Sequence, residues 1–159
     1  MDQDSFFNTG NGIADALLSE KQRQASAYNT IIEFNGMLPQ DILSPTDLCV
    51  ILGNTLDNAV EACQKINSDA NKIISISCNC TSGFLFLTIR NPINESIPIH
   101  NNYVATTKEN KTLHGFGLLS LHSVVKKYDG SVKLIASNNL FTANIELCIM
   151  SHQTEVLNE

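Results

Sequence analysis

The chain has 159 residues, of which 43% are apolar and 16% are charged, and this is the composition of a globular protein with a core. A net charge of −6 argues against a general nucleic-acid binder, because no basic stripe could neutralise many phosphates. No stretch reaches the ~20 apolar residues that span a bilayer, and the beginning of the chain lacks a signal-peptide pattern.

The first predicted elements are a helix over residues 12–26 and a strand over residues 28–34. The helical segment is rich in helix formers, and Asn11 or Thr9 can cap its start. The strand follows from the alternating, β-branched pattern of YNTIIEF, which Asn35-Gly36 closes. The apolar stripe of the helix is expected to comprise Ile13, Ala16, Leu17 and Ala25.

A second helix is predicted over residues 46–66. Ser44 or Thr46 can cap it, Pro45 suits its entry, and Asp47 is favourable in its first turn. Side chains at helical spacing form one broad apolar face, which comprises Leu48, Ile51, Leu52, Leu56, Ala59, Val60 and Cys63.

The same helix carries a polar face formed by Asn54, Asn58 and Glu61. These residues recur at steps of four and three, so their side chains stack along the helix. Two Asn inside a helix are locally unfavourable, because their amides compete with the backbone for hydrogen bonds. The face is therefore either simply solvated or used for binding.

The next segment predicts a hairpin of strands 72–80 and 84–91, joined by the short turn 81–83. Residues 93–113 are polar and irregular, and a structureless loop of this length in a small domain is often a functional lid.

A third helix is predicted over residues 115–129, where Asp129-Gly130 ends it, and a second hairpin joins strands 131–137 and 139–150 across Asn138-Asn139. The element order predicts an α+β fold. Its five-stranded mixed sheet would be covered on one face by three helices, which gives a two-layer sandwich.

Five cysteines lie in predicted helices or strands, and none forms a CxxC pair. A metal site would need further convergent ligands, which no nearby His supplies. We therefore expect buried, reduced thiols at Cys49, Cys63, Cys78, Cys80 and Cys148.

The residues HGFGL, 114–118, form a glycine-rich approach to a helix start. Such a turn directs backbone N–H groups and the positive end of the helix dipole at an anion, although a plain structural turn explains it equally well. Upstream, Thr107 and Lys108 add donors for phosphates, whereas Lys111 and His114 are weaker candidates, because exposed loop Lys and His residues are usually just solvated.

Asn91 ends a strand before Pro92, a place where side chains often line a ligand crevice. Its carboxamide can accept from an exocyclic amine and donate to a ring nitrogen, which suits adenine. The alternative is an Asn that satisfies the turn at the strand end.

Taken in order, NTLDNAVEAC, Asn91, the loop and HGFGLLSL resemble the GHKL ATP-binding superfamily of histidine kinases, gyrase B subunits, ninety-kilodalton chaperones and mismatch-repair ATPases. The helix 46–66 resembles its N-box helix, residues 93–113 its ATP lid and the helix 115–129 its G2-box helix. The pairing TTK…HGFGL, with Asn91 in place of the usual Asp-x-Gly, is most similar to histidine kinases of the peptide-pheromone quorum-sensing type. The resemblance implies a Bergerat-type α/β sandwich.

The resemblance also implies roles for named residues. Asn58 would hold the Mg²⁺ that bridges the ATP phosphates, Asn54 would contact phosphate or a metal-bound water, and Glu61 would orient this shell. Asn91 would occupy the adenine-reading position. The phosphates would be contacted by Thr107, Lys108, His114, Gly115, Gly117 and the Leu118 amide, and Lys108 would share the catalytic role with Asn54 and Asn58.

Asn54 bears on the type of reaction. Hydrolysing members of the superfamily carry Glu at this position as a base, whereas an amide cannot take a proton at neutral pH. A histidine acceptor needs less help from a base, so Asn54 favours phosphoryl transfer to histidine. None of His100, His114, His122 and His152 lies in a helical hairpin that could present an acceptor.

We therefore expect residues 1–159 to be one catalytic domain, the cytoplasmic part of a membrane-anchored bacterial sensor. The acceptor histidine, the dimerisation domain and the membrane sensor would lie upstream in the natural protein. Expected partners are ATP with Mg²⁺, that dimerisation domain and a response regulator of the LytTR type, with no direct contact to nucleic acid. The alternatives are a catalytically degenerate nucleotide-binding module and a non-enzymatic scaffold.

Overall fold

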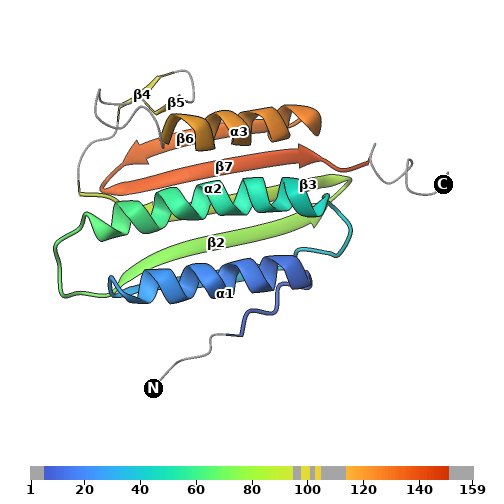
Figure 1. The fold of residues 1–159 in the computed structure, drawn as a ribbon. Coiled ribbons are helices and arrows are strands. Elements are labelled where there is room, and N and C mark those ends of the chain that lie inside the picture. Colours follow the sequence, from blue (N-terminus) through green and yellow to red (C-terminus); the bar gives the residue numbers. More distant parts are fainter. Residues whose placement is uncertain (1–5, 95–97, 101–102, 105–113, 151–159) are drawn as a thin grey trace.

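The computed structural model describes residues 6–94, 98–100, 103–104 and 114–150. The helices of the described part of the chain lie over one face of a curved sheet (Figure 1). The helices are α1 (Gly12–Ser26), α2 (Pro45–Gln64) and α3 (His114–Lys127). The strands are β1 (Thr30–Gly36), β2 (Lys72–Thr81), β3 (Phe84–Pro92), β4 (Ile99–His100), β5 (Tyr103–Val104), β6 (Ser131–Ser137) and β7 (Leu140–Cys148).

The main sheet has the order β1-β2-β3-β7-β6. β1 pairs with β2 in parallel, and the other neighbouring strands are antiparallel. The α+β class, the five-stranded mixed sheet and the single helical layer are thus confirmed. The helix ends differ slightly from expectation, since α2 spans 45–64 and not 46–66, and α3 spans 114–127 and not 115–129.

β4 and β5 pair as a separate two-stranded sheet, inside the segment 93–113 that was expected to lack secondary structure. That expectation is wrong for these residues. Strands of two residues are too short to leave an alternating pattern in the sequence.

Both predicted hairpins are confirmed, and positive φ angles form their turns. Ser82 and Gly83 have φ of 52° and 80°, and Asn138 and Asn139 have φ of 52° and 58°. Two consecutive residues with positive φ define the type I′ turn, whose twist matches that of paired antiparallel strands.

α2 is the central helix, and its predicted apolar face is buried in full. Ser44 caps it, since its hydroxyl accepts from the Asp47 N–H at 3.2 Å, and Pro45 occupies the first turn. The face packs on sheet residues that alternate along β2, β3 and β7, namely Ile74, Ile76, Leu85, Leu87, Ile89, Ala143, Ile145 and Leu147.

The stripe predicted for α1 is wrong for Ile13 and Ala16, which are both exposed. The buried residues are Ala14, Leu18, Gln22 and Ala25, so the helix is rotated relative to expectation. The rotation places Gln22 on β1, where its Nε2 donates to the Thr30 carbonyl at 3.0 Å and its Oε1 accepts from the Ile32 N–H at 2.7 Å. The prediction missed Gln22 because it counted only apolar residues as buried, whereas the buried face of α1 includes this polar side chain.

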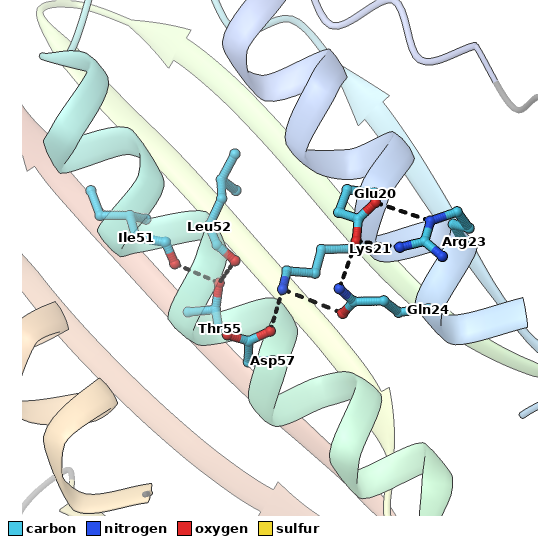
Figure 2. Close-up of polar contacts among 8 residues, drawn as sticks. All are labelled: Glu20, Lys21, Arg23, Gln24, Ile51, Leu52, Thr55 and Asp57. Atoms are coloured by element: carbon cyan, nitrogen blue, oxygen red, sulfur yellow. Dashed lines mark hydrogen bonds and ion pairs between the residues drawn. The ribbon is translucent and has the colours of Figure 1, made fainter. Parts of the chain in front are cut away.

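α2 makes one polar contact to α1 and others within its own helix (Figure 2). Lys21 of α1 pairs with Asp57 of α2, so the Asp57 side of α2 faces α1. The buried Thr55 hydroxyl donates to carbonyls of its own helix, at 2.7 Å from Ile51 and 3.2 Å from Leu52. Because its hydroxyl is hydrogen-bonded within the helix, burial of Thr55 costs little free energy and needs no polar partner from another element.

The expected burial of the cysteines is wrong for Cys49, which is exposed, and holds only in part for Cys80 and Cys148, which are half-buried. Cys49 follows the buried Leu48 by one residue, and one residue turns a helix by about 100° away from its buried face. Cys63 and Cys78 are buried, and burial raises the pKa of the Cys78 thiol to about 12. In the part of the chain that the structure describes, no helix is long and apolar enough to cross a membrane.

Candidate functional site

The site is built where α2 and α3 lie against each other. The two helices run antiparallel, since Asp47 near the start of α2 contacts Lys127 at the end of α3, whereas Asn54 lies beside Gly117 near the start of α3. A Cβ placed on Gly117 would lie 3.5 Å from both Cγ and Oδ1 of Asn54. Two motifs far apart in the sequence thus lie side by side.

The polar face of α2 has the expected orientation. Asn54, Asn58 and Glu61 are all half-buried, whereas the apolar face of the helix is fully buried. Glu61 pairs with Lys65 one turn later, with 3.1 Å between Oε1 and Nζ. The Asn54 carboxamide makes no side-chain hydrogen bond to another described residue, so its donor and acceptor groups remain available on the α3 side.

Asn91 lies at the end of β3 with an exposed fraction of 3%. It follows Leu85, Leu87 and Ile89 in the alternation, so its side chain is on the face that the helices cover. One amide N–H donates to the Pro92 carbonyl at 3.0 Å, which is the local turn contact expected for a strand-end Asn. Close by in the sequence, Asn94 donates to the Lys65 carbonyl at the end of α2, at 3.1 Å.

The glycine turn opens α3. His114 is the first helical residue, so Gly115 lies in the first turn, where backbone N–H groups lack partners within the helix. Leu118 is 7% exposed, and its side chain belongs to the core. The backbone of His114 is placed in the helix, whereas Thr107 and Lys108 lie outside the described residues.

Three parts of the predicted site thus lie at one end of the molecule: the C-terminal half of α2, the end of β3 and the start of α3 (Figure 1). Among the described residues no group of three or more His, Cys, Asp or Glu could hold a metal ion. The carboxamide oxygen of Asn58 is a donor of the oxygen type that Mg²⁺ accepts.

The opposite end of the α2–α3 pair carries a buried polar cluster that the sequence did not reveal. Asp47 Oδ2 accepts from Lys127 Nζ and from the Tyr128 hydroxyl, each at 2.6 Å, and that hydroxyl accepts from the Ser44 N–H at 3.3 Å. Burial favours the neutral form of Asp47, but the bonds from Lys127 and Tyr128 outweigh it and lower its pKa. The pKa of Tyr128 is raised by burial and by its bond to Asp47. Only Asp47 had been noted, as a favourable residue of the first turn.

A sequence model of the GHKL domain matches residues 43–148, which is more than half of the 159-residue chain. The chain therefore belongs to the GHKL domain family. The matched segment contains α2, β3, α3 and the contact between Asn54 and Gly117.

Solved histidine kinases share the fold. The catalytic domain of histidine kinase ThkA superposes with a TM-score of 0.66 at 17% identity, over 86% of this chain and 92% of that one. Acinetobacter baumannii histidine kinase AdeS gives 0.61 at 14% identity, over 87% of this chain and 64% of that one. Full-length ShkA in complex with AMPPNP gives 0.62 at 13% identity, over 86% of this chain and only 29% of that one. Identities this low show the common fold alone, and none of the curated proteins matches the chain.

Proposed function

We propose that this chain binds Mg-ATP between α2 and α3 and is the catalytic domain of a sensor histidine kinase. The observation that carries the proposal is the contact of Asn54 with Gly117, because it places a carboxamide face of α2 beside the glycine-rich start of α3. The kinases with the same fold support the choice, and ShkA was solved with an ATP analogue.

Each residue has a role that its chemistry allows. Asn58 offers a carboxamide oxygen to Mg²⁺ without adding negative charge beside the phosphates, and Glu61 orients this shell. Asn54 contacts a phosphate or a metal-bound water. The first-turn amides of α3 around Gly115 bind phosphate oxygens, and Gly117 leaves space for them. Further phosphate donors are Thr107, Lys108, His114 and the Leu118 amide.

Asn91 is proposed to read the adenine. One N–H of its carboxamide donates to the Pro92 carbonyl, so the oxygen acceptor and the second N–H can bind the edge of a purine. An Asp at this position could only accept when ionised, so a carboxamide reads the base through a different pair of contacts.

The reaction is phosphoryl transfer to a histidine on a dimerisation domain outside this sequence. The imidazole nitrogen attacks the γ-phosphorus, the bond to the bridging oxygen breaks, ADP leaves, and the imidazole N–H proton passes to solvent. Asn54 cannot accept a proton, which fits a nucleophile that needs no base. Lys108 and the α3 amides would stabilise the charge that develops on the transferred group.

The finer assignment is to a quorum-sensing type of kinase, a bacterial sensor that signals to a response regulator of the LytTR type. The TTK…HGFGL pairing and Asn91 support it. In this proposal the whole of residues 1–159 is the catalytic domain and faces the cytoplasm, and the membrane sensor precedes it.

Calorimetric titration with Mg-ATP tests the proposal, using the wild type, Asn58→Ala and the matched control Asn79→Ala. Asn79 lies exposed on β2, so it tests the same chemical change away from α2. We expect binding by the wild type and by Asn79→Ala, and a large loss of affinity in Asn58→Ala. No heat with the wild type would refute nucleotide binding.

Transfer is tested separately, by adding a kinase dimerisation domain with its histidine and following radiolabel from ATP. Label on the added domain, and none on this chain alone, is the expected result. Binding without transfer would favour the second candidate, a degenerate GHKL module that acts through protein contacts.

A further inference from the structure

The α2–α3 pair carries a cluster of polar side chains at one end, and at the other end an asparagine of α2 faces a glycine of α3. At the first end Asp47 Oδ2 binds both Lys127 and Tyr128 at 2.6 Å. At the second end Asn54 faces Gly117, which has no side chain to fix the spacing. The distance between the helices at the candidate site is therefore set by the apolar packing of α3, which includes the buried Leu118 and Leu121, together with the orientation that its far end gives to α3.

The far-end contact is suited to fix an orientation. Asp47 is 6% exposed and Tyr128 3% exposed, so both hydrogen-bonding groups are held within the core and compete little with water. Asp47 lies in the first turn of α2 and Lys127 in the last turn of α3, so each charge also interacts favourably with its own helix dipole. The Ser44 N–H completes the arrangement by donating to the Tyr128 oxygen at 3.3 Å.

Other contacts keep the end of α3 folded without this cluster. The Tyr128 carbonyl accepts from the Cys148 N–H at 3.0 Å, and the Gly130 N–H donates to the Val125 carbonyl at 2.9 Å. These backbone bonds tie α3 to β7 and to its own turn, but not to α2. The Asp47 cluster joins the end of α3 to the start of α2 through polar side chains.

The geometry amplifies small changes. At a rise of about 1.5 Å per residue, Gly117 lies about 15 Å along α3 from Lys127. A tilt of about 5° at the far end would then move Gly117 by about 1.3 Å relative to Asn54. Displacements near 1 Å are enough to impair a site that depends on convergent groups.

We infer that Asp47, Tyr128 and Lys127 are positioning residues, which set the spacing between the polar face of α2 and the glycine turn of α3. This inference rests on the proposed nucleotide site, to which it assigns a control point outside any contact with the ligand. The cluster acts on ligand affinity through helix orientation, in addition to its part in stability.

The test compares Tyr128→Phe and Lys127→Met with the control Gln22→Leu. Gln22 supplies an equally buried polar tie, but between α1 and β1, away from α3. Melting temperature and the Kd for Mg-ATP are measured for each protein. We expect the Kd to rise about 3- to 30-fold in the two cluster variants and to stay unchanged in Gln22→Leu, although all three melt earlier.

Two further readouts separate positioning from general destabilisation. The amide NMR signals of Gly115 and Gly117 should shift in Tyr128→Phe and not in Gln22→Leu. Lys127→Arg, which keeps a charged donor, should restore the affinity that Lys127→Met loses. The Lys127 side chain is 53% exposed, so its variants remain foldable even where Tyr128→Phe is not.

The outcomes distinguish the two proposals. A wild type that binds no Mg-ATP refutes the nucleotide site and the positioning role with it. A wild type that binds, with cluster variants of unchanged Kd, refutes the positioning role alone. An equal loss of affinity in Gln22→Leu also refutes it, because the effect would then follow stability in general.

Discussion

Asn54 of α2 and Gly117 of α3 lie so close that a methyl group on Gly117 would touch the Asn54 carboxamide, at 3.5 Å from its Cγ and Oδ1. This is ordinary van der Waals contact, so the fold itself could accept a side chain there. A glycine at this point therefore leaves room beside Asn54 for something other than protein. In the proposed site this space belongs to the phosphates.

Gly117→Ala should separate stability from binding. Alanine in a helix is favoured over glycine by about 1 kcal/mol, so the free energy of unfolding should rise or stay level. The added methyl group lies over the carboxamide, so Mg-ATP affinity should fall. Chemical denaturation and calorimetry measure the two effects.

Gly53→Ala is the matched control for this change. Gly53 lies in the interior of α2, and a Cβ there meets no atom within 4 Å. It is one helical turn from Asp57, on the side that faces α1, and so away from Gly117. This variant should gain stability and keep its affinity. Unchanged affinity in Gly117→Ala would contradict a nucleotide beside Asn54.

Asn54 should not act as a general base in ATP hydrolysis. Removing a general base lowers a rate by about 100-fold or more, whereas an amide takes no proton at neutral pH. We expect a slow basal turnover at saturating ATP, and a loss of rate in Asn54→Ala well below the ~100-fold that the loss of a base causes, measured by phosphate release. Fast turnover that Asn54→Ala abolishes would contradict both the role of Asn54 and the kinase assignment.

The elements that the sequence predicted best are those whose burial is apolar and regular. The face of α2 from Leu48 to Cys63 has an unbroken helical period, and the turns at Ser82 and Asn138 carry residues that tolerate positive φ. Pattern alone therefore located the sheet, the three helices and the polar face that includes Asn54.

The features that it missed depend on polar groups that contact each other only in the folded chain. Gln22 reads as a surface residue of a helix, and nothing in the spacing of Asp47 and Tyr128 links them across the chain. Their burial is stable because each finds a partner from a distant segment, which periodicity does not encode. The proposed site lies between these two cases. Each of its motifs is a short stretch that the sequence reveals, but the motifs come together only in the folded chain.

Acid should weaken the link between Asp47 and α3. The pKa of Asp47 is lower in the folded state than in the unfolded chain, so its stabilisation is present above the unfolded pKa and is lost as the pH falls through the folded value. Asp47→Asn should cost about 1–3 kcal/mol at neutral pH, the range for a buried hydrogen-bonded group. The gap between wild type and variant should narrow below about pH 4.

Denaturant titrations at several pH values measure this gap. At alkaline pH the informative variant is Tyr128→Phe. The raised pKa of Tyr128 means that its contribution is complete below its unfolded pKa and is lost as the pH rises through the folded value. A gap for Asp47→Asn that is independent of pH would contradict a charged Asp47 in the folded protein.

Thiol labelling should follow exposure. Cys49 should react first with a maleimide, because it is exposed on α2. The buried Cys63 and Cys78 should react last, because burial raises the pKa of both thiols, that of Cys78 to about 12. Mass spectrometry of the native protein should show early labelling that Cys49→Ser removes. Rapid labelling of Cys78 would contradict the packing of α2 on β2.

Gln22 should contribute more to the free energy of unfolding than a glutamine in a helix usually does, because its side chain is buried. Gln22→Leu removes the partners of the Thr30 carbonyl and the Ile32 N–H on the edge strand β1, which should cost about 1–3 kcal/mol. Gln24→Leu is the control, since Gln24 is exposed and its side chain bonds Glu20 and Lys21 at the surface of α1 (Figure 2). Such surface changes stay within about 0.5 kcal/mol. Both variants have similar helix propensity, so the difference reports the tie between α1 and β1. Equal stability of the two variants, measured by chemical denaturation, would mean that water replaces Gln22 at the strand edge.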